Sequence, residues 1–108
     1  MSDLSDRHMF RYVVPVDDQA HDFKLTGDPV AVAAPTLECV EFWAEHDEDA
    51  DVADRTFRVF GTGQPLPHGA VWRGTCPRIA GLVWHLYEVT GPAQPLTEVA
   101  RRMQRWGR

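Results

Sequence analysis

Apolar and polar side chains alternate along most of this chain up to about residue 90. A period of two places successive side chains on opposite faces of a β-strand, so Phe10, Tyr12, Val14 and Val16 share one face. Turn-forming residues separate such segments at short intervals, which is typical of a small antiparallel sandwich or a partly open barrel. The expected strands cover residues 10–16, 21–25, 30–34, 36–46, 55–60, 70–76 and 81–90.

Residues 38–48 also allow a helix, because glutamate and alanine are good helix formers. Val40, Phe42 and Trp43 favour a strand instead. The neighbouring strands also need a partner with which to pair. We therefore predict a strand in this segment and keep a helix as the alternative.

The period changes after residue 91, where apolar residues recur at the spacing of an amphipathic helix. These are Leu96, Val99, Ala100, Met103 and Trp106. We predict a disordered N-terminus over residues 1–8, a mainly β domain over residues 9–90 and a short C-terminal α-helix over residues 91–108. Met103 and Trp106 are the candidate interface residues of this helix, which either covers an open end of the sheet or docks on another subunit.

Composition narrows the class of partner. The chain has 108 residues, which is the size of one domain, and a formal net charge of −5, which disfavours binding to nucleic acid. Acidic residues gather in residues 45–54 and arginines in residues 101–108, so the two segments could attract each other within a chain or between subunits.

No apolar run approaches the length of a membrane span and the N-terminus is polar, so we expect a soluble, intracellular protein. Cys39 and Cys76 are expected to be buried free thiols, with a disulfide between them as the alternative.

The run Gly61-Thr62-Gly63 follows a strand, as a phosphate-binding loop would. A nucleotide loop needs a helix directly after it, but Pro65 and Pro67 leave no room for one. We therefore predict a strand-ending turn whose glycines adopt positive φ, with a nest of backbone N–H groups that binds an anion as the alternative.

The remaining candidates for a metal site or a catalytic site are weaker. The five histidines lack the spacing of metal ligands, and residues 47–58 lack the glycine and the final glutamate of a calcium loop. The serines, Ser2 and Ser5, lie in the expected disordered N-terminus, so no nucleophile stands out. Alternation places His85 beside Val83 and Tyr87, either as a half-buried histidine bonded to the backbone or as a ligand contact.

Four segments, taken in order, resemble a family of short proteins of unknown function that are encoded mainly by bacteriophages and prophages. They are Phe10-x-Tyr12-x-x-Pro15, the run Arg-Thr-Phe-Arg-Val-Phe-Gly-Thr-Gly at 55–63, Gly74-Thr75, and Val-Trp-His-Leu-Tyr-Glu at 83–88. The resemblance covers roughly residues 9–89, and the acidic residues 45–54 and the tail after Val89 depart from it. The family has no assigned catalytic residues, so the resemblance implies a phage-like origin and a compact β domain.

Taken together, these features indicate a binding protein rather than an enzyme, with no cofactor and no metal. We expect a phage or prophage accessory protein that engages a host protein or a small anionic ligand, in the host cytoplasm or in the virion. The alternative is a structural virion or assembly component that uses the sheet edge and the C-terminal helix in a homo-oligomer. The candidate binding residues are Arg58, Gly61, Thr62, Gly63, Arg73 and His85.

Overall fold

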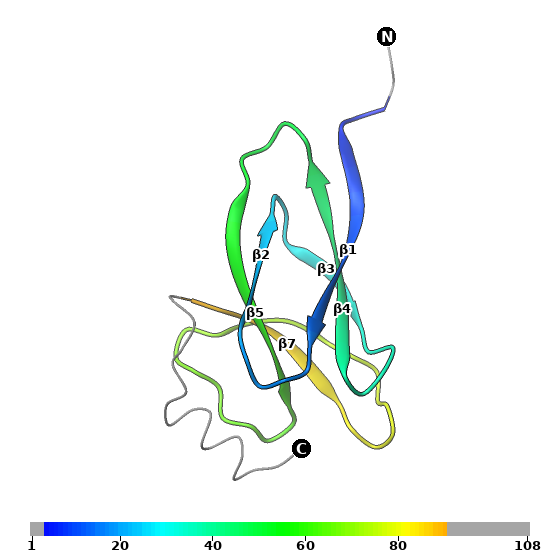
Figure 1. Cartoon of the computed structure of the whole chain (residues 1–108), viewed down its shortest axis with the longest axis vertical. Coiled ribbons are helices and arrows are strands. Elements are labelled where there is room, and N and C mark those ends of the chain that lie inside the picture. The colour runs from blue at the N-terminus through cyan, green and yellow to red at the C-terminus, as the bar shows by residue number, and fades with distance from the viewer. Residues whose placement is uncertain (1–3, 91–108) are drawn as a thin grey trace.

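The computed structural model describes residues 4–90, which form two antiparallel sheets packed face to face (Figure 1). One sheet has the strand order β1-β4-β3 and the other has the order β2-β5-β7-β6. The described residues contain no helix, and the sheets do not close into a barrel. The strands are β1 (Arg7–Pro15), β2 (His21–Leu25), β3 (Pro29–Ala33), β4 (Cys39–Asp47), β5 (Ala53–Gly61), β6 (Val71–Thr75) and β7 (Trp84–Val89).

The expected mainly β architecture is therefore confirmed, and it takes the form of a sandwich. The predicted C-terminal helix, with Met103 and Trp106, lies outside the described residues. The strand predicted over residues 36–46 is confirmed as β4, against the helical alternative. The expected disorder over residues 1–8 is wrong at its end, because Arg7 and His8 pair with Asp47 and His46 of β4.

The alternation of side chains decides which face of each strand enters the core. Val40, Phe42 and Ala44 of β4 are fully buried, and β1 turns Val14 and Tyr12 toward them. Opposite them, β5 contributes Phe57 and Val59, β7 contributes Trp84 and Leu86, and β2 contributes Leu25. Burial of such side chains from water is the main favourable contribution to folding.

Aromatic rings occupy the middle of this core. The Phe42 ring lies 5.0 Å from the ring of Tyr12 in its own sheet and 5.0 Å from the ring of Phe57 in the other sheet. Phe23 meets Phe42 edge-on at 5.4 Å. Edge-on and offset contacts between aromatic rings add to the energy gained by burial. The rings therefore join the two sheets.

The lateral contact between the sheets, on the side where β3 lies near β6, depends on a glycine. A Cβ atom at Gly74 of β6 would lie 2.7 Å from one methyl group of Val32 and 2.8 Å from the other. A larger residue at position 74 would push β3 away from β6. Gly74 therefore sets how closely the two sheets approach here.

Both cysteines are free, but only Cys76 is buried as expected, since Cys39 is half-buried. Cys76 is buried in the core, and burial raises the pKa of its thiol to about 11. The thiol is therefore protonated at neutral pH, which makes it a poor nucleophile.

Candidate ligand-binding site at the end of strand β5

The end of β5 forms the tight turn that the glycines predict. The side-chain Oε1 of Gln64 accepts a hydrogen bond from the N–H of Gly61, and the N–H of Gln64 donates to the carbonyl of Gly61 over 3.2 Å. Gly63 has a φ of 94°, which favours glycine. No helix follows among the described residues, so the run forms the predicted strand-ending turn.

Gly61, unlike Gly63, does not adopt positive φ, so the expectation for both glycines holds only at Gly63, but a side chain at position 61 would be crowded. A Cβ atom here would approach Cζ3 of Trp84 to 3.2 Å and Oε1 of Gln64 to 3.4 Å. The missing side chain thus lets the Trp84 ring and the Gln64 amide pack against the same piece of backbone.

His85 is held by two hydroxyl groups. Its Nε2 lies 2.8 Å from Oγ1 of Thr62, and its Nδ1 lies 3.0 Å from Oγ1 of Thr75. The indole Nε1 of Trp72 donates to the same Thr75 oxygen over 2.9 Å. The sequence-based expectation of a backbone partner is therefore corrected, because β6 and the turn each bring a threonine to the imidazole.

Burial lowers the pKa of His85 below its ordinary value of 6.5. The imidazole is consequently neutral at pH 7, with one nitrogen that donates and one that accepts. Because a threonine hydroxyl can either donate or accept, both tautomers satisfy both bonds. The hydrogen bonds from Thr62 and Thr75 therefore fix the imidazole ring without adding charge to the site.

Two hollows lie on either side of the turn and share Gly61 and Thr62 in their walls. The first, of about 160 Å³, is also lined by Gln64 and His85. The second, of about 280 Å³, is also lined by Trp84 and Arg78. No carboxylate lines either hollow. Arg78 therefore makes the second hollow locally positive, although the whole chain is acidic.

Two buried side-chain N–H groups, one on Gln64 in the turn and one on Trp84 of β7, lack an acceptor among the residues that the structure describes. They are Nε2 of Gln64 and Nε1 of Trp84. Gln64 is 7% exposed and Trp84 is 2% exposed, so water does not readily compensate either group. The orientation of the Gln64 amide is fixed, because its oxygen is needed by Gly61. A buried donor without a partner typically costs about 1–3 kcal/mol, and calls for an explanation.

Arg58 does not belong to these hollows. Its side chain is 5% exposed and lies over the ring of Phe60, with the guanidinium carbon 5.1 Å from the ring centre. Burial lowers its pKa, and the nearby carboxylates of Asp18 and Asp17 partly oppose that shift. Arg58 therefore lines neither hollow, and its role in binding stays a prediction.

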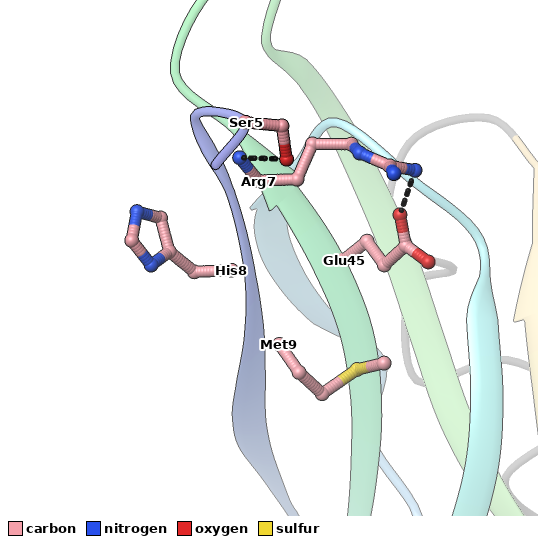
Figure 2. Close-up of a pocket in the computed structure, with 5 residues that line it drawn as sticks. All are labelled: Ser5, Arg7, His8, Met9 and Glu45. Atoms are coloured by element: carbon pink, nitrogen blue, oxygen red, sulfur yellow. Dashed lines mark hydrogen bonds and ion pairs between the residues drawn. The ribbon is translucent and has the colours of Figure 1, made fainter. Parts of the chain in front are cut away.

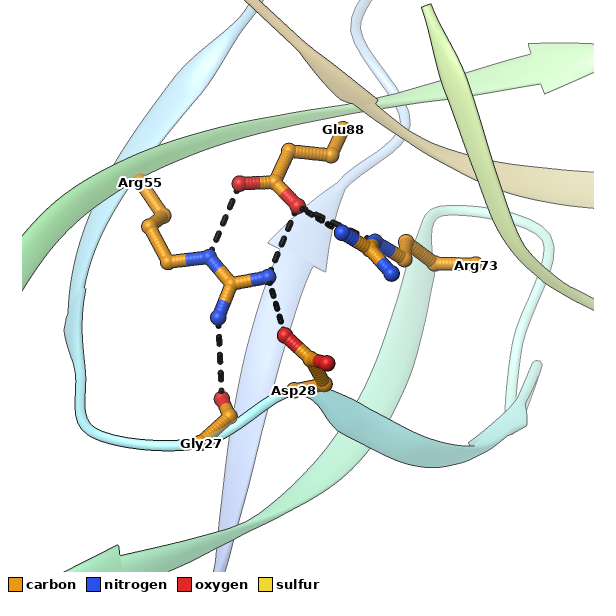
Figure 3. Close-up of polar contacts among 5 residues, drawn as sticks. All are labelled: Gly27, Asp28, Arg55, Arg73 and Glu88. Atoms are coloured by element: carbon orange, nitrogen blue, oxygen red, sulfur yellow. Dashed lines mark hydrogen bonds and ion pairs between the residues drawn. The ribbon is translucent and has the colours of Figure 1, made fainter.

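Arg73 is also placed elsewhere, in an ion-pair network between β5, β6 and β7 (Figure 3). Glu88 accepts from Nε and Nη2 of Arg55, each over 2.8 Å, and from Nε and Nη2 of Arg73 over 3.0 and 2.8 Å. Asp28 adds a further ion pair to Arg55 at 2.7 Å. The bonds from Arg55, and then those from Arg73, hold the pKa of Glu88 below its ordinary value, although burial opposes the shift. Arg73 therefore has a structural role.

Sequence reasoning missed this network, although the alternation carried a signal for it. Arg55 shares the inward parity of Phe57, and Glu88 shares that of Leu86. Charged side chains on a core-facing parity are expected to pair with each other. The unpaired N–H groups of Gln64 and Trp84 leave no comparable signal in the sequence, because hydrogen-bond partners depend on the folded structure.

Within residues 4–90, no group of three or more histidine, cysteine or acidic side chains lies close enough to hold a metal ion. Cys76 and His85 are also kept apart by the sheet. Cys76 lies in the core between the sheets, whereas His85 lies on the opposite face of its sheet. Nor is any described helix long and apolar enough to cross a membrane.

Comparison with known families links the chain to a domain of unknown function, DUF7352, whose model matches residues 5–97. Searches of curated proteins and of solved structures found no match. The matched range contains every strand of the sandwich and the whole candidate site. The chain therefore belongs to the DUF7352 family.

Proposed function

We propose that this domain is a non-catalytic binding module that takes a small anionic ligand at the turn formed by Gly61 and Thr62. In this proposal it is an accessory protein of a bacteriophage or prophage and acts in the host cytoplasm. The observation that carries the proposal is the hollow of about 280 Å³ lined by Gly61, Thr62 and Arg78, in which no carboxylate faces the arginine. A ligand with acceptor oxygens would give Arg78 a partner there.

The surrounding charges favour an anion over a neutral acceptor. Arg78 lines the second hollow and makes no ion pair among residues 4–90, and no acidic side chain faces it across the wall. Hydrogen bonds from charged groups are stronger than those between neutral groups. The hydroxyl of Thr62 adds an adaptable partner between the two hollows.

The size of the site limits the ligand. Hollows of about 160 and 280 Å³ are smaller than the pockets that usually enclose a drug-sized molecule, roughly 300–1,000 Å³. A carboxylate or a phosphate group, alone or at the end of a longer molecule, is the class of ligand that matches this space.

Calorimetric titration with inorganic phosphate and with acetate tests the proposal. Gln64→Glu keeps the acceptor that Gly61 needs but replaces the free donor by a carboxylate oxygen, so we expect binding to be lost. Arg78→Gln should weaken binding roughly tenfold or more, because a charge-assisted bond is removed. Lys24→Gln, on an exposed pair with Asp54, is the matched control and should leave binding unchanged. Equal affinities in all four proteins, or no binding in any, would contradict the proposal.

A further inference from the structure

The outer edge of β1 differs from the three other sheet edges. β1 has nine residues in an uninterrupted register with β4, whereas β2, β3 and β6 have five each. The registers of β3 and β6 also contain a shift, a feature that discourages pairing with another chain. Within residues 4–90, β1 pairs with β4 alone. It is therefore the longest and most regular open edge that the structure describes.

Two backbone bonds at the ends of this pair establish which groups of β1 point outward. The N–H of Val16 donates to the carbonyl of Glu38 over 2.8 Å, and the N–H of Glu48 donates to the carbonyl of Asp6 over 3.2 Å. Both bonds continue the β1–β4 register, so even-numbered residues of β1 direct their backbone groups at β4. The odd-numbered residues direct theirs at the open edge.

The start of β1 agrees with this assignment (Figure 2). The N–H of Arg7, an odd-numbered residue, donates to the hydroxyl of Ser5 over 3.3 Å and not to β4. The N–H groups of Met9, Arg11 and Val13 follow on the same edge, and the structure gives them no acceptor within residues 4–90.

The side chains around this edge are apolar or already neutralised. Met9 is 54% exposed, Val13 is 47% exposed and Phe10 is 41% exposed. The charges that would normally protect such an edge are paired within the chain, Arg7 with Glu45 at 3.0 Å and Arg11 with Glu41 at 3.3 Å (Figure 2 draws the first pair). Paired charges give weaker protection against edge-to-edge association than free ones.

We infer that β1 is the pairing edge of a symmetric homodimer, in which β1 of one copy lies antiparallel to β1 of a second copy. One register has its two-fold axis at Phe10. Met9 then faces the partner's Arg11, and Arg7 faces the partner's Val13. Each arginine faces an apolar side chain, so no like charges lie opposite each other, and the two Phe10 rings meet. The two three-stranded sheets become one continuous sheet with an isologous interface.

The charge at position 9 tests this register. Sedimentation velocity of the full chain over a range of concentrations should give a monomer–dimer equilibrium. Met9→Lys places a cation opposite the partner's Arg11 at two symmetric positions, so the dimer should weaken roughly tenfold. Met9→Glu places a carboxylate opposite the same arginine, so the dimer should not weaken. Thermal unfolding of each variant checks that the fold is intact.

A cross-link provides an independent readout that does not depend on affinity. In a Cys39→Ser background, Phe10→Cys places two thiols opposite each other in a non-hydrogen-bonded pair, where Cα atoms lie about 4.5 Å apart and a disulfide can form. Oxidation should give a covalent dimer that a reductant reverses. His8→Cys, which would face the partner's Tyr12, is the matched control and should stay uncross-linked. A chain that remains monomeric with no cross-link at position 10, or one that cross-links equally at positions 8 and 10, would overturn the inference.

Discussion

At the residue scale, the ion-pair network of β5, β6 and β7 centres on Glu88. It is the carboxylate shared by Arg55 and Arg73, whose side chains are 17% and 26% exposed. Glu88→Gln would leave two partly buried guanidinium groups without that anion. We expect a loss of about 1–3 kcal/mol in the free energy of unfolding, measured in urea, which is less than for a fully buried pair. Glu45→Gln, which removes the exposed partner of Arg7, should cost less than about 0.5 kcal/mol.

The same carboxylate should make stability depend on acidity. Since its pKa is lower in the folded than in the unfolded chain, its contribution is present above the unfolded value of about 4.3 and is lost as pH falls through the folded value. The free energy of unfolding of the wild type should therefore drop more steeply than that of Glu88→Gln between about pH 5 and pH 3. If the free energies of unfolding of the two proteins changed in parallel with pH, Glu88 would contribute nothing to the pH dependence of stability.

Protonation of His85 should also lower the free energy of unfolding, in a higher pH range than protonation of Glu88. Burial lowers its folded pKa, so protonation favours the unfolded chain, and stability falls as pH drops below about 6.5. Proton NMR of the imidazole should give a titration midpoint below 6.5. A midpoint above that value would contradict the neutral hydroxyl–imidazole chain.

At the element scale, the contact between β3 and β6 can be tested by a pair of substitutions. Gly74→Ala would bring a methyl group against Val32, so it should destabilise the fold by about 1–3 kcal/mol. Val32→Ala removes the opposing methyl groups and should make the same change at position 74 much less costly. A double-mutant cycle by urea unfolding measures this coupling, and strictly additive effects would argue against the close contact.

Alternation was sufficient to predict the strands, because burial on one face enforces a period of two. At residues 36–46 a strand was preferred over a helix, and the structure shows which face of it is buried, the one with Val40 and Phe42. The ends of the strands were less predictable from the sequence. Residues 81–83 were assigned to the last strand, but Ala80 and Gly81 have φ of 47° and 80° and close a tight turn first, so β7 begins at Trp84. Turn conformation at a non-glycine residue leaves little trace in the sequence.

At the scale of the whole molecule, the sequence predicted part of the candidate site. Gly61, Thr62, Gly63 and His85 were grouped from the sequence and line one hollow, because β5 ends beside the start of β7. Arg58 and Arg73 were grouped with them but line neither hollow. Their partners depend on the register of β5, β7 and β6, which a single sequence does not specify. The family match places the whole sandwich within one DUF7352 domain, and the proposed binding turn and the proposed pairing edge lie on different sheets of it.

This separation means that the two proposals can fail independently. Met9→Lys should weaken self-association without changing the response to phosphate, and Arg78→Gln should do the reverse. Sedimentation velocity and calorimetry on both variants give the comparison. A single substitution that abolished both properties in a folded protein would indicate that the turn and the edge are coupled.

The most direct test of the binding site observes side-chain N–H signals of Gln64 and Trp84, which line the two hollows. In ¹H–¹⁵N NMR spectra, the side-chain amide of Gln64 and the indole N–H of Trp84 each give a separate signal. Titration with inorganic phosphate or acetate should shift both signals in a saturable way, and Arg78→Gln should reduce the shifts while Lys24→Gln leaves them unchanged. If neither signal moves while the protein is folded, or if shifts occur only at residues away from Gly61 and Thr62, the turn is not the ligand site.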